Sequence, residues 1–310
     1  MSSPSSTGSS GPDTTGGLTG SAAASARGVL AATCLSTFVV NANTSAVSIL
    51  LPAISADTGM DVTTLQWAVT GYSLVGAAVI VTSGSLGDVF GRKLVFQLGL
   101  LLFVVSCVFI GLSSSGGAVI AGRFIQGAAG ATILACGLSL LSVANSGQEQ
   151  LRAVSLWGAA AAVGAAAGPL LGGVLVEVTG WQGLFWVGAA IAAVCMVLTW
   201  KTVTESKDDN RPRDIDFAGS ALIALTLGPL ILALSKGSAW GWVSPATIGC
   251  LAVGVAAGFA FVVVEKRVAV PMLDLVLLRN RVLVGSTVAL LIGAGTIHGL
   301  MYLVSLYFQD

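Results

Sequence analysis

Few side chains in this sequence have the chemistry of a functional site, and the clearest candidate is Arg123. It stands inside a long run of apolar residues, in the segment Gly122-Arg123-Phe124-Ile125-Gln126. An arginine at membrane depth is costly, so it normally faces a cavity, a partner or a functional path. Gln126 follows three residues later and shares the same helix face. The alternative is that Arg123 extends its long side chain to the outer interface.

A second candidate is a charged turn that contains Asp88, Arg92 and Lys93 between the glycines Gly84 and Gly91. The glycines allow a tight turn and a close approach of helices. Asp88 stands at a helix end, where it can accept hydrogen bonds from Arg92 or from the N-terminus of a neighbouring helix. The alternative is a turn that serves membrane topology only.

A third candidate is a row of small residues. Gly164, Gly168 and Gly172 recur every four residues and form one smooth helix face, which lets a second helix approach closely. Pro169 removes a backbone hydrogen bond and bends the helix, and Gly173 follows Gly172 directly. Small-residue packing occurs in many membrane bundles, so the spacing alone is weak evidence.

Other polar residues in apolar runs leave their roles open. Asn41 and Asn43 have side chains that can bind a substrate by hydrogen bonds or pack helices together. His298, the single histidine, titrates near neutral pH and is a candidate proton carrier, with a packing role as the alternative. The cysteines lie in apolar surroundings, where we expect buried packing: Cys34, Cys107, Cys136, Cys195 and Cys250.

The composition defines the class of protein that must position these residues. Of 310 residues, 55% are hydrophobic, 40 are glycine and only 9% are charged. Soluble domains carry about 25% charged residues, so a soluble globular protein is excluded. The 14 basic and 14 acidic residues balance, which excludes nucleic-acid binding through a basic face. No metal-ligand spacing, nucleophile elbow or phosphate loop is present, so we expect no metal, no cofactor and no enzyme activity.

Long uncharged intervals predict the membrane spans. Each is a continuous apolar run of about 20 residues or more without two-residue alternation, which favours transmembrane helices over a barrel. We therefore predict an all-α membrane protein with nine transmembrane helices in the lipid bilayer. The intervals are 28–56, 62–87, 94–122, 124–148, 153–176, 178–200, 217–235, 237–264 and 282–309.

The basic residues orient these spans. Of the 14 Lys and Arg residues, Arg123 falls within a span and Lys236 falls in an outer segment, which leaves twelve in inner segments if the N-terminus is inside. By the positive-inside rule the N-terminus is cytoplasmic. Residues 1–26 are rich in small polar residues and are expected to form a flexible cytoplasmic tail. Residues 201–216 form a charged cytoplasmic loop after a six-span unit at 27–200.

The charged turn resembles the signature loop of the major facilitator superfamily. The matching positions are Gly84, Leu86, Asp88, Gly91, Arg92 and Lys93. Val89 departs from the pattern, because the family usually has a basic residue there. The resemblance implies a membrane-embedded helical bundle in which Asp88 and Arg92 belong to a conformational latch on the cytoplasmic side.

Two further segments carry the same resemblance. The segment from Arg123 to Gly127 is similar to the fourth-helix motif R-x-x-q-G of the family, whose arginine is associated with proton coupling. The segment from Gly164 to Gly173 resembles the antiporter motif, which is associated with export. In the first helix, Asn43 stands where the family branch usually has an aspartate, so the usual proton site is absent there.

Several segments resemble the branch of drug:proton antiporters with fourteen helices. Gln66, Trp67 and Tyr72 open the second span as in drug exporters, and with Asn41 and Asn43 they are the expected substrate cavity. The remaining matches are residues 181–186, 216–219, 240–242, 271–275 and 279–281. The resemblance implies that 217–264 form two extra linker helices and that 265–310 begin the C-terminal half. We therefore expect a partial sequence, truncated from fourteen helices.

The implied function is efflux of a small amphipathic drug or antibiotic by alternating access across the plasma membrane, with protons as the coupling ion. Metabolite uptake or facilitated diffusion is the alternative among transporters. A truncated membrane protein that does not transport is the alternative from a different class. Neither the exported substrate nor the oligomeric state follows from the sequence.

Overall fold

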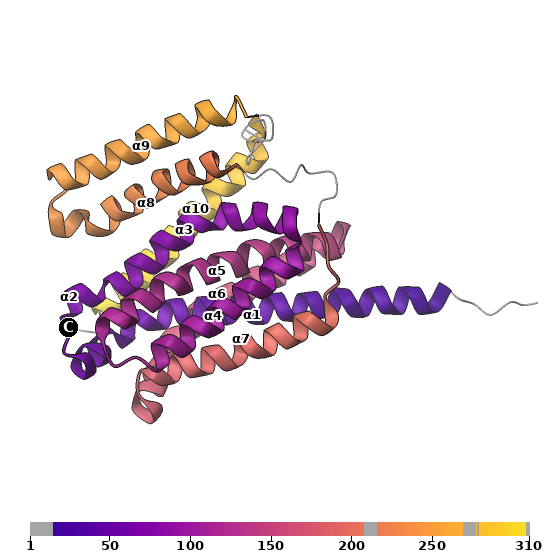
Figure 1. Ribbon diagram of the computed structural model, residues 1–310, viewed down its shortest axis with the longest axis horizontal. Coiled ribbons are helices and arrows are strands. Elements are labelled where there is room, and N and C mark those ends of the chain that lie inside the picture. The colour runs from indigo at the N-terminus through magenta and orange to yellow at the C-terminus, as the bar shows by residue number, and fades with distance from the viewer. Residues whose placement is uncertain (1–14, 208–215, 269–276, 278, 308–310) are drawn as a thin grey trace, which may run out of the picture.

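All regular elements in the described part of the chain are helices (Figure 1). The computed structural model describes residues 15–207, 216–268, 277 and 279–307, and the side chains of these residues except 15–24, 217, 294 and 297–307. The helices are α1 (Thr15–Thr58), α2 (Val62–Leu65), α3 (Trp67–Phe90), α4 (Arg92–Gly111), α5 (Gly116–Ala144), α6 (Gly147–Thr179), α7 (Gln182–Thr202), α8 (Phe217–Trp240), α9 (Pro245–Glu265) and α10 (Arg281–Tyr307).

The lengths and composition of these helices confirm an all-α membrane protein. In the described residues, eight helices are long and apolar enough to cross a bilayer, from the span that begins at Ser25 to the one that ends at Glu265. The ninth predicted span, 282–309, corresponds to α10, of which Arg281–Gly293 is the apolar stretch found within the described residues.

Three of the differences between helix boundaries and the predicted spans are informative. The first helix, α1, begins at Thr15, so residues 15–26 of the expected flexible tail are helical. The predicted span 94–122 ends early, because α4 stops at Gly111 and the side chain of Ser115 caps α5. The predicted spans were bounded by charged residues, whereas the ends of the helices are set by their capping residues. Residues 1–14 lie outside the described part, as do Arg211 and Arg213.

The third difference concerns Lys236, which the prediction placed in an outer loop between two spans. Lys236 lies within α8, which continues to Trp240 and ends at Gly241 with φ at +89°. A positive φ is accessible to glycine at little cost, so the helix ends and the chain turns at Gly241 and not at Lys236. The next helix, α9, then starts with Ser244 as its cap and Pro245 in its first turn.

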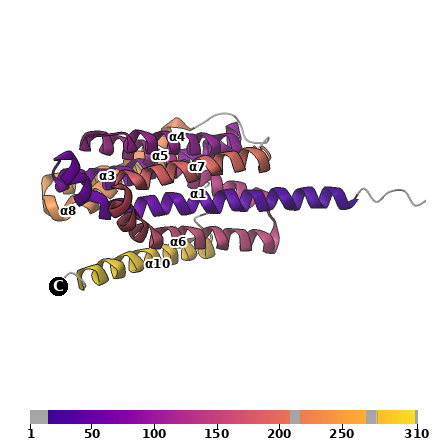
Figure 2. The same cartoon turned by 90° about the horizontal axis from the view of Figure 1, so that it is seen from below.

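The first seven helices form one bundle around α1 and α5. α1 packs against α5, α6 and α7, while α5 also packs against α3 and α4. α4 and α7 lie side by side, and the α8–α9 pair lies against α3 on one side of the bundle (Figures 1 and 2). The N-terminal part of α1 extends well beyond the other helices in both views.

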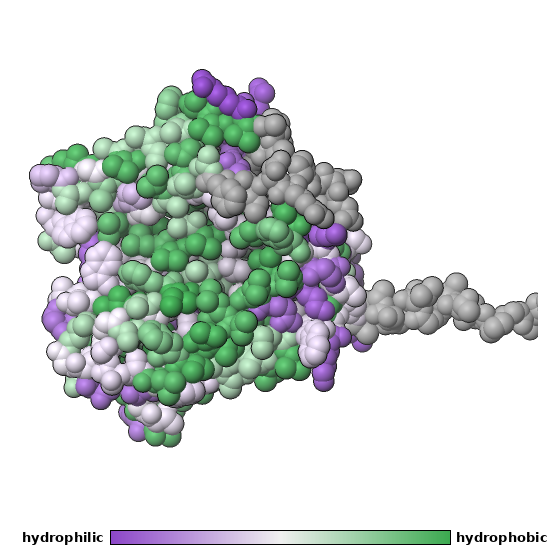
Figure 3. Space-filling model, viewed as in Figure 1, coloured by the Kyte–Doolittle hydropathy of each residue, from purple (hydrophilic) through white to green (hydrophobic). Residues whose placement is uncertain are grey.

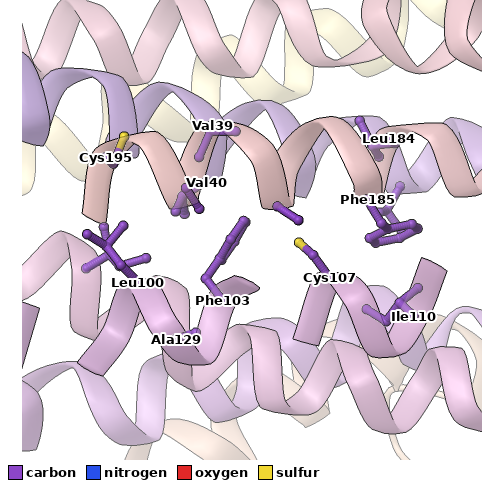
Figure 4. Packing of buried hydrophobic residues seen from close by; sticks show 14 of the residues in the cluster. Val39, Val40, Leu100, Phe103, Cys107, Ile110, Ala129, Leu184, Phe185 and Cys195 are labelled. Carbon is purple, nitrogen blue, oxygen red and sulfur yellow. The ribbon is translucent and has the colours of Figure 1, made fainter. Parts of the chain in front are cut away.

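The core of this bundle is apolar and closely packed. Phe103 and Cys107 of α4 point toward α7, and Phe185 of α7 lies opposite Ile110 of α4 (Figure 4). Between helices in a bilayer, such side chains stabilise the fold by van der Waals contacts, because lipid tails are as apolar as the side chains themselves. All five cysteines are free, and Cys107, Cys136 and Cys195 are buried as the sequence predicts, whereas Cys34 and Cys250 are half-buried.

The outer surface of the bundle is apolar along the helices. Large exposed hydrophobic side chains include Leu170 and Val178 of α6 and Phe259 of α9. Green residues extend along the helices in the space-filling view, while purple residues gather where α1 leaves the bundle (Figure 3). This pattern suits helices whose outer faces contact lipid, because exposing so much apolar surface to water is unfavourable.

Candidate functional site

Arg123 lies at the centre of a buried polar cluster between α1, α3, α4 and α5. Its side chain is 0% exposed. Nε donates to the backbone carbonyl oxygen of Ala68 at 3.1 Å. Nη1 donates to Oδ1 of Asn43 at 3.0 Å and to Oε1 of Gln126 at 2.5 Å. The guanidinium therefore joins α1 and α3 to its own helix, α5, and it does not extend to the outer interface.

Two further side chains complete this group, which we name the Arg123 cluster: Arg123, Gln126, Asn43, Tyr72 and Cys107. The guanidinium carbon of Arg123 lies 4.2 Å from the centroid of the Tyr72 ring, a cation–π contact. Nε2 of Gln126 donates to Sγ of Cys107 at 2.9 Å. The spacing of three residues predicted Gln126 beside Arg123, but no sequence pattern placed Tyr72, Cys107 or Asn43 beside them.

Glycines allow the aromatic ring of Tyr72 to approach α5. A Cβ at Gly127 would overlap the backbone carbonyl of Tyr72, and a Cβ at Gly130 would lie 2.5 Å from the Tyr72 hydroxyl oxygen. A Cβ at Gly71 would overlap the ring of Phe124. Because none of these glycines carries a side chain, α3 and α5 come close enough for the ring of Tyr72 to cover Arg123.

The row of glycines in α6 faces α1. A Cβ at Gly164 would overlap the carbonyl oxygen of Phe38, and one at Gly168 would overlap the carbonyl oxygen of Ala42. A Cβ at Gly172 would lie 3.1 Å from Cβ of Ala46. Hence the spacing of four places three glycines against one stretch of α1.

This glycine interface positions Asn43, because Asn43 belongs to the stretch of α1 that α6 contacts. Gly173 is different, since a Cβ there would meet no described atom within 4 Å. Pro169 lies inside α6 between the contacting glycines. The interface thus depends on Gly164, Gly168 and Gly172, and not on the paired glycine that follows them.

The charged turn connects α3 to α4. Nε and Nη2 of Arg92 donate to Oδ1 of Asp88 at 3.0 and 2.8 Å, and this pair is 15% and 24% exposed. Gly91 has φ at +115°, a conformation that favours glycine, and it is the single residue between the end of α3 and the start of α4. Gly84 has open space around it, since a Cβ there would meet no described atom within 4 Å.

The loop after α7 folds back onto this turn, a contact that no sequence pattern predicted. The carboxylate of Glu205 accepts hydrogen bonds from the backbone N–H groups of Lys93 and Leu94 at 3.0 and 3.1 Å. Nζ of Lys93 donates to the carbonyl oxygens of Trp200 and Val203 at 3.0 and 2.6 Å. A carboxylate at the first turn of α4 satisfies orphan donors and complements the helix dipole.

The remaining residues of the expected substrate cavity do not join one site. Asn41 donates from Nδ2 to the carbonyl oxygen of Thr37 in its own helix at 2.9 Å. Gln66 is exposed at the junction of α2 and α3. Nζ of Lys236, which is 8% exposed, lies 5.1 Å from the centroid of the Trp67 ring and so links α8 to α3. His298 belongs to α10, and its side chain lies outside the described ones.

A metal site is not apparent in the part of the chain that the structure describes. Its His, Cys, Asp and Glu residues form no group of three or more that is arranged to hold a metal ion.

The fold and the buried cluster define a helical membrane protein that spans the bilayer many times and carries a polar centre inside an apolar bundle. The model of the Major Facilitator Superfamily matches residues 33–310. The chain belongs to this family, as the resemblance of its motifs predicted.

The chain is similar in sequence to named proteins that are longer than it is. It is 31% identical over 281 residues to the tetracenomycin C resistance and export protein of Streptomyces glaucescens, covering 91% of this chain and 52% of that protein. It is 31% identical over 282 residues to the multidrug resistance protein Stp of Mycobacterium tuberculosis, with the same coverages. The chain thus spans about half the length of these relatives.

A solved structure shares the fold. The crystal structure of the human organic anion transporter MFSD10 superimposes with a TM-score of 0.54 at 19% sequence identity, covering 69% of this chain and 56% of that one. At this identity the likeness concerns the arrangement of helices and nothing more.

Proposed function

We propose that the chain is the N-terminal part of an exporter that moves a small amphipathic molecule out of the cell by alternating access, in exchange for protons. The relatives described above bear the names of a resistance and export protein and of a multidrug resistance protein. In this proposal the two helical halves rock around a site near the middle of the membrane. The described bundle α1–α7 supplies one half.

The observation that carries the proposal is the contact between α6 and α1 through Gly164, Gly168 and Gly172. These glycines belong to the segment that resembles the antiporter motif of exporters. The close approach leaves no room for side chains between the two helices, so α1 and α6 move as one rigid unit. Rigid-body rocking of a half needs such units, because packed interfaces switch between discrete arrangements and do not deform continuously.

In this proposal the cytoplasmic turn is the conformational latch. The Asp88–Arg92 pair and the Glu205 carboxylate at the start of α4 are the contacts that form in one transport state and break in the other. Partly exposed ion pairs of this kind contribute only about 0–1 kcal/mol each. Contacts this weak can form and break in every transport cycle.

Proton coupling is assigned to the region of Arg123 and Gln126, with His298 as a candidate carrier on α10. Asn43 lies in direct contact with Arg123 and is an amide, so it cannot carry the proton. The protein is placed in the plasma membrane with a cytoplasmic N-terminus. The basis for this orientation is the excess of basic residues in the segments on that side, namely twelve of 14.

The test is transport in inverted membrane vesicles from cells that express the complete gene. Addition of ATP or lactate generates an inward proton gradient, and a panel of cationic, neutral and anionic fluorescent dyes serves as the set of probes. An exporter accumulates at least one of these dyes inside inverted vesicles, and nigericin, which collapses the pH gradient, stops the accumulation. Vesicles from cells without the gene are the control.

Two results contradict the proposal. Equilibration of a probe that nigericin does not change indicates facilitated diffusion. Absence of transport for a panel of cationic, neutral and anionic dyes indicates a protein that does not export such molecules.

A further inference from the structure

The Arg123 cluster contains more hydrogen-bond donors than acceptors. A guanidinium has five N–H bonds and no acceptor, and those on Nε and Nη1 reach three oxygens. Nη2 of Arg123 is buried without a hydrogen-bond partner, and so is Nδ2 of Asn43. Both side chains are almost completely buried, at 0% and 2% exposure. Buried donors without partners are rare and destabilising, so this pair requires an explanation.

The orientation of the amide groups does not remove this surplus. Since arginine only donates, Asn43 and Gln126 must both turn their oxygen atoms toward it. Nε2 of Gln126 then donates to Sγ of Cys107, whereas Nδ2 of Asn43 points to no acceptor. Rotating the Asn43 amide would place two donors face to face and leave its oxygen without a donor.

The charge of Arg123 is also uncompensated. Its contacts are a backbone carbonyl, two amide oxygens and the face of the Tyr72 ring, all of them neutral. Within the described residues, the ion pairs of the bundle involve Arg92 and Arg152, and none involves Arg123. A buried cation is normally stabilised by an opposite charge that is hydrogen-bonded to it.

We propose that Arg123 and Asn43 bind an anionic hydrogen-bond acceptor, and that this group is a carboxylate or phenolate of the exported molecule. An anion supplies both missing features, because it offers acceptor atoms to Nη2 and Nδ2 and a negative charge to the guanidinium. The assignment to the exported molecule rests on the proposed function, whereas the anion site does not. Chloride has the same charge and accepts the same hydrogen bonds. The test therefore compares chloride with an organic anion as the ligand of this site.

The test measures the unfolding temperature, Tm, of the protein expressed from its complete gene and held in lipid nanodiscs. Sodium benzoate or sodium chloride replaces sodium tetrafluoroborate, whose anion accepts hydrogen bonds poorly, at constant ionic strength, and benzamide is the neutral counterpart of benzoate. A ligand that binds only the folded protein raises Tm by mass action, by roughly 5 °C at about a hundred times its Kd. We expect this shift with benzoate and none with benzamide.

Asn43→Asp is the decisive variant. It places a carboxylate of the chain itself beside Nη1 of Arg123, so the site no longer needs an external anion. We expect a higher Tm in tetrafluoroborate and no further shift with benzoate or chloride. Asn41→Asp adds the same charge to the same helix, at a side chain that bonds to Thr37, and should keep the shift.

Each outcome has one meaning. A shift at lower concentrations of benzoate than of chloride supports an organic anion, and equal potency supports an inorganic one. If neither anion raises Tm, the proposal is wrong. This result is also the one expected if another part of the protein supplies the carboxylate. A shift that persists in Asn43→Asp also overturns it. If vesicles do not export while the shift is present, the proposed export is wrong and the anion site stands.

Discussion

Two arginines of the bundle, Arg92 and Arg123, have their charges stabilised in opposite ways. Arg92 pairs with a carboxylate one helical turn away and is 15% exposed. Arg123 is 0% exposed, and its hydrogen bonds all go to neutral oxygens. The first arginine interacts locally, whereas the second interacts with residues on α1 and α3 that are distant in sequence.

The comparison shows which arginine the fold constrains more. A partly exposed ion pair contributes about 0–1 kcal/mol, so Arg92 can exchange partners at little cost. Each buried polar group left without a partner costs about 1–3 kcal/mol, so losing Arg123 disturbs several groups together. The buried arginine should therefore tolerate almost no substitution, and the interfacial one should tolerate a conservative one.

The largest effect is expected for Arg123→Lys. A lysine keeps the charge but lacks the planar fork that reaches Ala68, Asn43 and Gln126 together. With about 1–3 kcal/mol lost per unpaired group, export should fall by about a hundredfold or more. Dye accumulation in inverted vesicles measures this effect, and immunoblots of the membranes check insertion.

The matched control for this substitution is Arg92→Lys, which should retain most of the export activity. Equal losses in the two variants would show that burial does not distinguish the two arginines.

The next effect concerns the interface that positions Asn43. A methyl group at Gly168 overlaps the carbonyl oxygen of Ala42, so Gly168→Ala should push α1 away from α6 and destabilise the protein by about 1–3 kcal/mol. Gly173→Ala meets no described atom within 4 Å and should be neutral or stabilise α6 by up to about 1 kcal/mol. Thermal unfolding in detergent compares the two variants.

A similar loss of stability in both glycine variants would mean that the contact with α1 is not what Gly168 provides. In Gly168→Ala, the Asp88–Arg92 pair lies outside the disturbed interface, so it should remain intact.

A smaller effect is expected for Glu205→Gln at the cytoplasmic end. The amide keeps one acceptor but removes the negative charge next to the first turn of α4, where Lys93 and Leu94 donate. Loss of this charge should cost about 0.3–1 kcal/mol and should be weaker at high salt. Unfolding temperatures at low and high ionic strength measure it, and a difference between variant and wild type that is independent of salt would argue against an electrostatic role.

The smallest change in stability is expected for Asp88→Asn, at about 0.2–1 kcal/mol, because the pair with Arg92 is partly exposed. If the pair is a latch, the rate of dye export should nevertheless fall while the amount of inserted protein stays the same. A variant that exports at the wild-type rate would leave this turn with a topological role only.

The sequence predicted the local features of the site well. The apolar intervals located the spans, the period of four located the face of α6 that contacts α1, and the period of three placed Gln126 beside Arg123. These features depend on helix geometry within one segment, so a single sequence contains them. Helix ends were less accurate, as Lys236 shows, because caps and glycine conformations decide them.

Contacts between distant segments could not be read from the sequence. Glu205 lies 112 residues from Lys93, and Asn43 lies 80 residues from Arg123. Their pairing depends on which helices are neighbours, and no local pattern encodes that choice.

By itself, the sequence determined a membrane-spanning helical bundle with an arginine inside it, since composition and periodicity are properties of the chain alone. Only the tertiary structure decided what surrounds that arginine: neutral oxygens and the ring of Tyr72, which leave Nη2 of Arg123 and Nδ2 of Asn43 without partners. The physical reason is that a side chain's partners come from packing. Glycines set how closely α1, α3, α5 and α6 approach, and that distance determines which groups can reach Arg123.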